Sequence, residues 1–362
     1  MRALFLLLGV WFAGCSTINL GAALGDASAE PPGLPLDLLW ERDADGAFGP
    51  SAAHVTDRFV VVGTRKGDVV VIDRDTGRIE GAGEFGDSVE GQLAVSPNGE
   101  VLYVPTVGGG GGVEAYDVRR GRRIWRWREG QVQAGVVRVG ATLVVPLLDG
   151  RLAGLDVATG DVRWERASPT GVQFHAAPLA VGTDVIVADD AGTVVRLRAL
   201  DGAEQWRAEV GAPVYAPPTA DVGAVYISTT RGDLARLDAG TGDVAWQVQD
   251  EEPLRVSSAA VGATGLAVGY SDGTVRGIDP TTGVERWRMQ GDGNVTAQPV
   301  WIGDRVAVGT LDRQLLIVDG RTGREEWSTE LRGRVKSALT VGSGLLVVLV
   351  EPRHVIAFHT AR

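Results

Sequence analysis

Short apolar runs separated by polar, glycine-rich turns recur along almost the whole chain. The run Leu345–Val350 is one example, and the stretch around Leu155 is another, with apolar residues leading into an Asp and a Thr-Gly turn. Runs of this length, bounded by turn-forming residues, are typical of buried β-strands. No stretch outside residues 1–15 has a convincing helical period. The pattern therefore predicts an essentially all-β protein.

The stretch Leu155–Trp164 is the clearest unit of an internal repeat. It contains an apolar strand end, an Asp, a Thr-Gly turn and a short strand that ends in Trp. Related stretches return about every 40 residues and place Trp in one column: Trp125, Trp164, Trp206, Trp246, Trp287 and Trp327. The copy Ile72–Gly81 keeps the turn but has Gly81 in place of Trp. A period near 40 with four short strands per unit indicates the blade of a β-propeller.

The residues that recur at the same position of successive repeats have structural explanations. The turn Gly supplies a positive φ, and the Asp side chain accepts hydrogen bonds from the backbone of the turn. A Trp that recurs once per blade can be covered by the next blade, burying roughly 150–250 Å². We therefore interpret the Trp column as packing between blades and not as a ligand site.

The two ends of the repeat region complement one another. Residues 38–42 resemble the last strand of a blade, with Trp40 in the Trp column. Residues 334–340, 345–350 and 354–358 resemble the first three strands of a blade. We infer that these fragments form one shared blade, closed by the N-terminal strand. The sequence thus predicts a single eight-bladed propeller over residues 36–362, since blades cannot bury their faces alone.

The N-terminus has the pattern of a targeting segment. Arg2 is followed by a short apolar stretch and then by small residues before Cys15, the single cysteine of the chain. This arrangement resembles the lipobox of bacterial lipoproteins. The resemblance implies a signal peptide over residues 1–14, lipidation of Cys15 and, with Ser16 next, an outer-membrane location facing the periplasm. The alternative is an ordinary signal peptide with an incidental cysteine. Residues 15–35 are expected to form a flexible tether after the lipidated cysteine.

Charge and composition narrow the functional classes. The net charge of −11 argues against nucleic acid as a partner and against an anionic lipid surface, so membrane contact is expected through the lipid anchor only. The histidines are isolated, without zinc-ligand spacing, and no nucleophile motif is present. We expect no metal, no cofactor and no enzymatic activity. The acidic pairs Asp189-Asp190 and Glu251-Glu252 are expected to be solvated loop residues.

The repeat resembles the PQQ-like (quinoprotein) propeller repeat over roughly residues 36–362. Together with the lipoprotein signal, it resembles the BamB family of outer-membrane protein assembly factors. The resemblance implies a non-enzymatic scaffold that binds the outer-membrane β-barrel assembly subunit. Another envelope protein or a glycan is the alternative ligand. A quinoprotein dehydrogenase is a weaker alternative, because those enzymes carry a vicinal cysteine pair and Cys15 stands alone.

Two loops of the BamB family that contact the barrel subunit differ in this chain. Residues 166–177 lack the family's Leu-x-Leu-Arg segment, and residues 208–219 lack its Asp-x-Asp segment. We therefore transfer no family contact residue. Aromatic, proline, leucine and arginine residues near the starts of first strands are the candidate partner-binding anchors. They are Phe174, His175, Tyr215, Pro217, Leu254 and Arg255. Packing of these residues inside the ring is the alternative.

Overall fold

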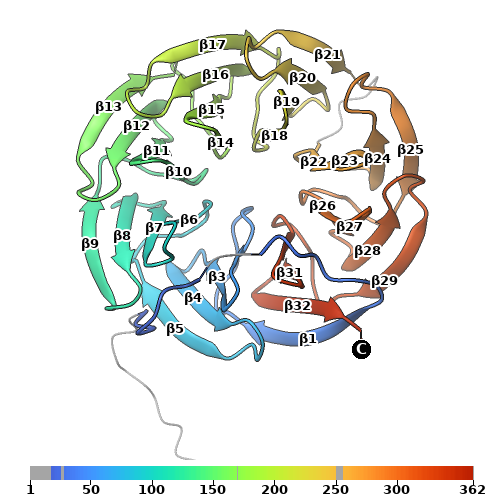
Figure 1. The fold of residues 1–362 in the computed structure, drawn as a ribbon, viewed down its shortest axis with the longest axis horizontal. Helices are drawn as coiled ribbons and strands as arrows, with labels where there is room; N and C mark the ends of the chain where they lie inside the picture. The colour runs from blue at the N-terminus through green and yellow to red at the C-terminus, as the bar shows by residue number, and fades with distance from the viewer. Residues whose placement is uncertain (1–17, 26–27, 169, 250–255, 362) are drawn as a thin grey trace, which may run out of the picture.

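The computed structural model describes residues 18–25, 28–168, 170–249 and 256–361. These residues form eight four-stranded antiparallel sheets arranged as a ring (Figure 1). The predicted all-β, eight-bladed propeller is confirmed. Cys15 and the predicted signal peptide lie outside the described residues.

Seven blades are meanders of four consecutive strands, and the eighth combines three consecutive strands with the N-terminal strand. We number the blades from 1 to 8 in the order in which their first strands occur. The first strands lie nearest the centre (Figure 1) and are β2 (His54–Val55), β6 (Ala94–Val95), β10 (Val137–Val139), β14 (Leu179–Val181), β18 (Thr219–Asp221), β22 (Ala260–Gly262), β26 (Val300–Ile302) and β30 (Thr340–Gly342). The second strands are β3 (Phe59–Gly63), β7 (Val101–Thr106), β11 (Thr142–Pro146), β15 (Asp184–Ala188), β19 (Ala224–Ser228), β23 (Gly265–Gly269), β27 (Arg305–Gly309) and β31 (Leu345–Val350).

The third and fourth strands of each blade lie toward the outside of the ring and complete the sheets. The third strands are β4 (Asp68–Asp73), β8 (Gly112–Asp117), β12 (Arg151–Asp156), β16 (Thr193–Arg198), β20 (Leu234–Asp238), β24 (Thr274–Ile278), β28 (Gln314–Asp319) and β32 (His354–Thr360). The fourth strands are β5 (Ile79–Glu84), β9 (Arg122–Trp127), β13 (Val162–Ala167), β17 (Glu204–Glu209), β21 (Val244–Val248), β25 (Glu285–Gln290), β29 (Glu325–Glu330) and, for blade 8, β1 (Leu36–Asp43).

The N-terminal strand β1 closes the ring. It pairs antiparallel with β32 from Leu36 opposite Thr360 to Asp43 opposite His354. Blade 8 therefore has the order β1-β32-β31-β30, as the sequence predicts. Figure 1 shows β1 lying along β32 at the outer edge of the ring. The closure leaves no gap between the first and last blades, so the ring has no exposed seam.

The core is divided among the eight junctions between neighbouring blades. One cluster of buried apolar side chains lies at each junction within the described residues. The second and third strands are almost wholly buried, while the fourth strands alternate between buried and exposed positions, as in β13. This alternation follows from the period of two in a strand that has one face toward solvent.

The Trp column connects consecutive blades. Trp164 lies over the turn glycine of the next blade, Gly202, and its Nε1 donates to the carbonyl of Ala199 at 2.9 Å. The same indole-to-carbonyl hydrogen bond is made by Trp40, Trp125, Trp206, Trp246 and Trp287. Trp327, at the junction of blades 7 and 8, instead packs edge-on against Phe358. Each of these six hydrogen-bonded Trp side chains thus holds a turn of its neighbour through both burial and a hydrogen bond, whereas Trp327 contacts its neighbour through ring packing.

The antiparallel topology gives the propeller two different faces. The connections between second and third strands, and those between blades, emerge together on one side, which we call the loop face. The turns between first and second strands and between third and fourth strands form the opposite side, the turn face. Asp238, in a turn of the turn face, accepts hydrogen bonds from the backbone N–H groups of Gly240 and Thr241. This bonding explains the Asp of the repeat.

Acid should weaken these turns. The pKa of Asp279 is lowered to about 2, first by its hydrogen bond from Arg286 and then by backbone N–H groups. Backbone hydrogen bonds likewise lower the pKa of Asp238, and the Thr322 hydroxyl lowers that of Asp319. A carboxylate with a lowered folded pKa stabilises the fold above its unfolded pKa, and this contribution is lost as pH falls through the folded value. We expect the melting temperature to fall between about pH 4 and about pH 2.

An Asp279→Asn variant tests this pH dependence. It should have a shallower loss of melting temperature over that range than the parent protein, when both are measured by circular dichroism at constant ionic strength. Asp68 and Asp190 have raised pKa values because of burial and act in the opposite direction. Equal acid slopes for parent and variant would contradict the assignment of the effect to the turn carboxylates.

Residues 18–25 and 28–35 lie against the propeller, although the sequence predicts a flexible tether over this range. The backbone N–H of Ser343 donates to Ser28 O at 2.8 Å, and that of Ala361 donates to Pro35 O at 2.7 Å. Ile18 is fully buried. The segment crosses the turn face before it enters β1 (Figure 1). The apolar residues of this stretch follow neither a strand nor a helix period, so the sequence does not reveal these contacts.

Candidate functional site

Two of the candidate partner-binding residues meet on the loop face between blades 3 and 5. His175 comes from the connection between β13 and β14, and Tyr215 comes from the connection between β17 and β18. Their ring centroids lie 4.8 Å apart at an interplanar angle of 43°. Tyr215 is 52% exposed. Residues that are 40 positions apart in the sequence therefore form one partly exposed aromatic pair.

Asp190 holds the imidazole of this pair in place. His175 Nδ1 lies 2.8 Å from Asp190 Oδ2 and 3.0 Å from Oδ1. The backbone N–H of Asp190 also donates to Gln173 O at 3.0 Å. Burial raises the pKa of the Asp190 carboxyl, while the neighbouring His175 opposes this shift. A ring fixed on one side by a carboxylate loses little conformational entropy when a partner contacts its other side.

Asp189, the residue before Asp190, stabilises the loop between β15 and β16 from its buried side. It is fully buried and accepts hydrogen bonds from Ser168 Oγ at 2.8 Å and from the backbone N–H groups of Ala191 and Thr193. The expectation of a solvated Asp189 is therefore wrong, because its carboxylate organises the loop between β15 and β16. A signal was present in the repeat: Asp189 stands in a column where other blades have a buried Thr, such as Thr229.

The loop that carries Tyr215 is tied to the next blade. Arg231, between β19 and β20, donates from its guanidinium to Gly211 O. The backbone N–H of Thr230 donates to Pro213 O at 2.9 Å. Pro217 is exposed in the same loop, two residues beyond Tyr215. We define the aromatic patch as His175, Tyr215 and Pro217.

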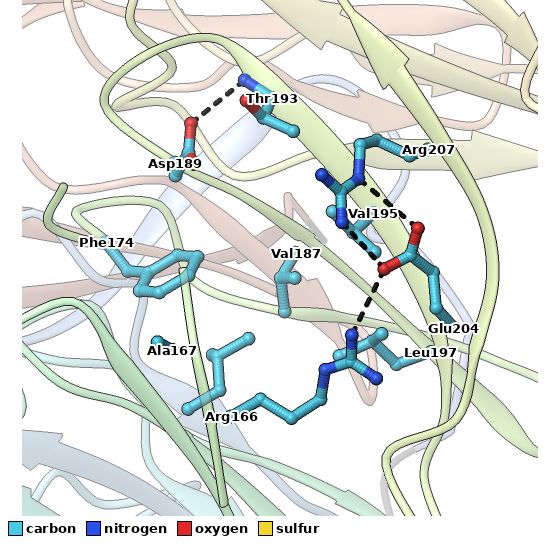
Figure 2. A pocket seen from close by; sticks show the side chains of 11 residues that line it. Arg166, Ala167, Phe174, Val187, Asp189, Thr193, Val195, Leu197, Glu204 and Arg207 are labelled. Atoms are coloured by element: carbon cyan, nitrogen blue, oxygen red, sulfur yellow. Dashed lines mark hydrogen bonds and ion pairs between the residues drawn. The ribbon is translucent and has the colours of Figure 1, made fainter. Parts of the chain in front are cut away.

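Phe174 does not belong to this surface. It is 2% exposed and packs with the cluster between blades 3 and 4. There it lines a cavity of about 140 Å³ together with Val187 and Leu197. Figure 2 shows the ring of Phe174 near Val187, with ion pairs from Glu204 to Arg166 and Arg207 on the other side. The cavity is smaller than the roughly 300–1,000 Å³ of small-molecule sites, so we assign it no ligand.

Two further candidates, Leu254 and Arg255, lie outside the described residues. Among the residues that the structure describes, no group of three or more His, Cys, Asp or Glu side chains is arranged to hold a metal ion. The same part of the chain contains no helix long and apolar enough to cross a membrane.

Comparison with known proteins identifies the family. A family model described as outer membrane protein assembly factor BamB matches residues 37–179, 167–292 and 271–362, which together cover the propeller. The chain belongs to the BamB family. The BamB of Xanthomonas campestris pv. campestris is 26% identical over 352 residues, covering 79% of this chain and 78% of that protein.

Two further matches show how far the similarity extends. The crystal structure of BamB from Moraxella catarrhalis superposes with a TM-score of 0.77 at 22% identity, covering 90% of this chain and 100% of that one. At this identity the match shows the fold. The serine/threonine-protein kinase AfsK of Streptomyces coelicolor is 33% identical over 169 residues. That match covers 46% of this chain and only 20% of the kinase, so the chain spans about a fifth of that relative's length.

Proposed function

We propose that the protein is a non-enzymatic accessory factor in outer-membrane protein assembly that binds the β-barrel assembly subunit through its loop face. Membership of the BamB family supports the general role. The observation that supports the face is the aromatic patch, in which His175 is held by Asp190 and packs at a tilt against Tyr215. Rigid, partly exposed aromatic residues are frequent anchors of protein interfaces.

The location follows as part of the same proposal. The lipobox-like sequence before Cys15 supports lipidation, which would attach the propeller to the outer membrane on its periplasmic side. Acyl chains supply about 0.8 kcal/mol per buried CH₂, so a lipidated cysteine can hold a propeller whose described residues include no membrane-spanning helix. The propeller would then contact its partner at the periplasmic surface of that membrane.

The proposal predicts that a His175→Ala/Tyr215→Ala double variant loses the partner. Loss of a single hot-spot residue costs at least about 2 kcal/mol, which weakens binding roughly 30-fold, so we expect recovery of the barrel subunit by co-purification to fall by at least this factor. The fold should remain intact, because Tyr215 is 52% exposed and neither residue is part of a buried apolar cluster. Circular dichroism and the melting temperature report on this.

A matched control lies on the opposite face of the same neighbourhood. Val222, in the turn between β18 and β19, is fully exposed on the turn face. A photo-crosslinking residue at position 217 should capture the barrel subunit in cells, whereas one at position 222 should not. Capture from 222 alone, or unchanged co-purification by the double variant, would contradict the proposal. Capture of a different envelope protein from 217 would keep the face but reject the partner.

A further inference from the structure

The junction between blades 1 and 2 is the one in the ring that lacks its tryptophan. The repeat has Gly81 at this position, on β5. At the next junction, Trp125 lies over the turn glycine of blade 3, Gly160, and donates from Nε1 to Val157 O at 3.1 Å. Without an indole, Gly81 leaves the equivalent glycine and carbonyl of blade 2 without either contact.

Residues of the N-terminal segment take over both contacts. The turn glycine of blade 2 is Gly121, and a Cβ placed there would lie 2.7 Å from Asn19 Cβ. A Cβ placed at Gly160 would lie 2.7 Å from the Trp125 ring, so both turn glycines are covered at the same distance. The backbone N–H of Leu20 donates to Val118 O at 2.9 Å. Val118 follows the turn aspartate, as Val157 does in the next blade.

Apolar contacts fill the rest of the space. Ile18 is fully buried and lies against β5, where its Cδ1 is 3.0 Å from a Cβ placed at Gly83. Leu24 is also fully buried in the cluster between blades 1 and 2. Its N–H donates to Gly99 O at 2.8 Å, and its carbonyl accepts from Thr56 Oγ1 at 2.7 Å. Residues 18–25, which we call the N-terminal strap, therefore contact both blades.

We propose that the gap beside Gly81 is a peptide-binding slot whose ligand is the chain's own segment, residues 18–25. The slot accepts a chain that bends at Gly21, with a branched apolar side chain, an N–H directed at Val118 O, and a second apolar side chain six residues after the first. The bound segment replaces the missing indole and stabilises the junction between blades 1 and 2. Residues 18–25 thus do at this junction what the Trp side chain does at the others.

The slot also determines where an anchor would hold the ring, and this step rests on the proposed function. Cys15 precedes Ile18 by three residues. Three extended residues span at most roughly 11 Å. A lipid on Cys15 would therefore keep the rim at blades 1 and 2 close to the membrane surface. A free tether of twenty residues would leave the propeller able to reorient.

Hydrogen–deuterium exchange of the full-length protein tests whether the slot is occupied. The amides of Leu20 and Leu24 should exchange at least about 10-fold more slowly than unprotected amides, because both donate to the propeller backbone. An Ile18→Asp/Leu24→Asp variant should lose this protection and melt at least about 5 °C lower. Ala29→Asp, an exposed residue outside the slot, is the matched control and should change neither measurement.

A rescue variant separates slot filling from other effects of the aspartates. Adding Gly81→Trp to the Ile18→Asp/Leu24→Asp variant should restore the melting temperature, while residues 18–25 remain unprotected. Absence of protection in the parent, an unchanged melting temperature in the double variant, or failure of Gly81→Trp to restore it would each overturn the proposal. None of these measurements depends on lipidation or on the barrel subunit, so their failure is distinct from failure of the proposed function.

Discussion

Replacing residues 36–43 by a Gly/Ser linker of equal length should destabilise the entire propeller and not blade 8 alone. These residues are β1, which supplies the fourth strand of blade 8 by pairing along the length of β32. Removing the strand exposes the edge of β32 and opens the ring. An open ring has unpaired edges, which favour aggregation.

The loss extends to both neighbouring junctions. Leu36 is buried in the cluster between blades 7 and 8, and Trp40 is buried in the cluster between blades 8 and 1. Trp40 also donates from Nε1 to Arg74 O and lies over Gly77 in blade 1. Truncating a buried Trp alone costs about 3–5 kcal/mol, which is a large part of the roughly 5–15 kcal/mol that stabilises a typical protein. We therefore expect the linker variant to be largely unfolded or aggregated at room temperature.

Size-exclusion chromatography and circular dichroism measure this outcome. Leu38→Ser is the matched control, because Leu38 is in the same strand and 56% exposed. It should elute and melt like the parent. If the linker variant eluted as a compact monomer with the parent's melting temperature, the closing role of β1 would be wrong.

Truncation of one regular Trp plate should also have a large effect. Trp164→Ala should lower the free energy of unfolding by about 3–5 kcal/mol, since it opens a cavity over Gly202 and removes the hydrogen bond to Ala199 O. Trp164→Phe should fall between this variant and the parent. It retains most of the ring but leaves the carbonyl of Ala199 without its donor, at a cost of about 1–3 kcal/mol.

The same strand provides the control for this pair. Val162, two residues before Trp164 on β13, points to solvent and is 46% exposed. Val162→Ala should leave stability within about 0.5 kcal/mol of the parent. Urea unfolding followed by circular dichroism gives the comparison. Similar midpoints for Trp164→Ala and Val162→Ala would show that the Trp column does not hold the blades together.

The ring was predictable from the sequence because each of its parts is local or repeated. The Gly and Trp columns specify a turn and a plate in every blade, and the half-repeats at the two ends require each other. The pairing of β1 with β32 follows from that requirement. Periodicity thus substitutes for knowledge of distant contacts, as in other repeat architectures.

The site and the N-terminal strap have no such redundancy. The contact of His175 with Asp190 depends on how two loops of different length approach one another, and neither residue recurs in the repeat. Burial of Ile18 depends on the space left by a single absent Trp at Gly81. The sequence shows the missing indole but contains no pattern that names its replacement. Exceptions to a repeat are therefore where the sequence is least informative.

The pairing of β1 with β32 also orders events in time. The partner of Trp40 in this sheet is Ala357, so the first strand of the ring is made long before the strand that it pairs with. At about 5–20 residues per second, roughly 15–60 s of synthesis separates them. During that interval, β1 and the earlier blades have exposed edges and no closed core. Protection of this open intermediate, more than the stability of the finished ring, would then limit how much protein reaches its folded state.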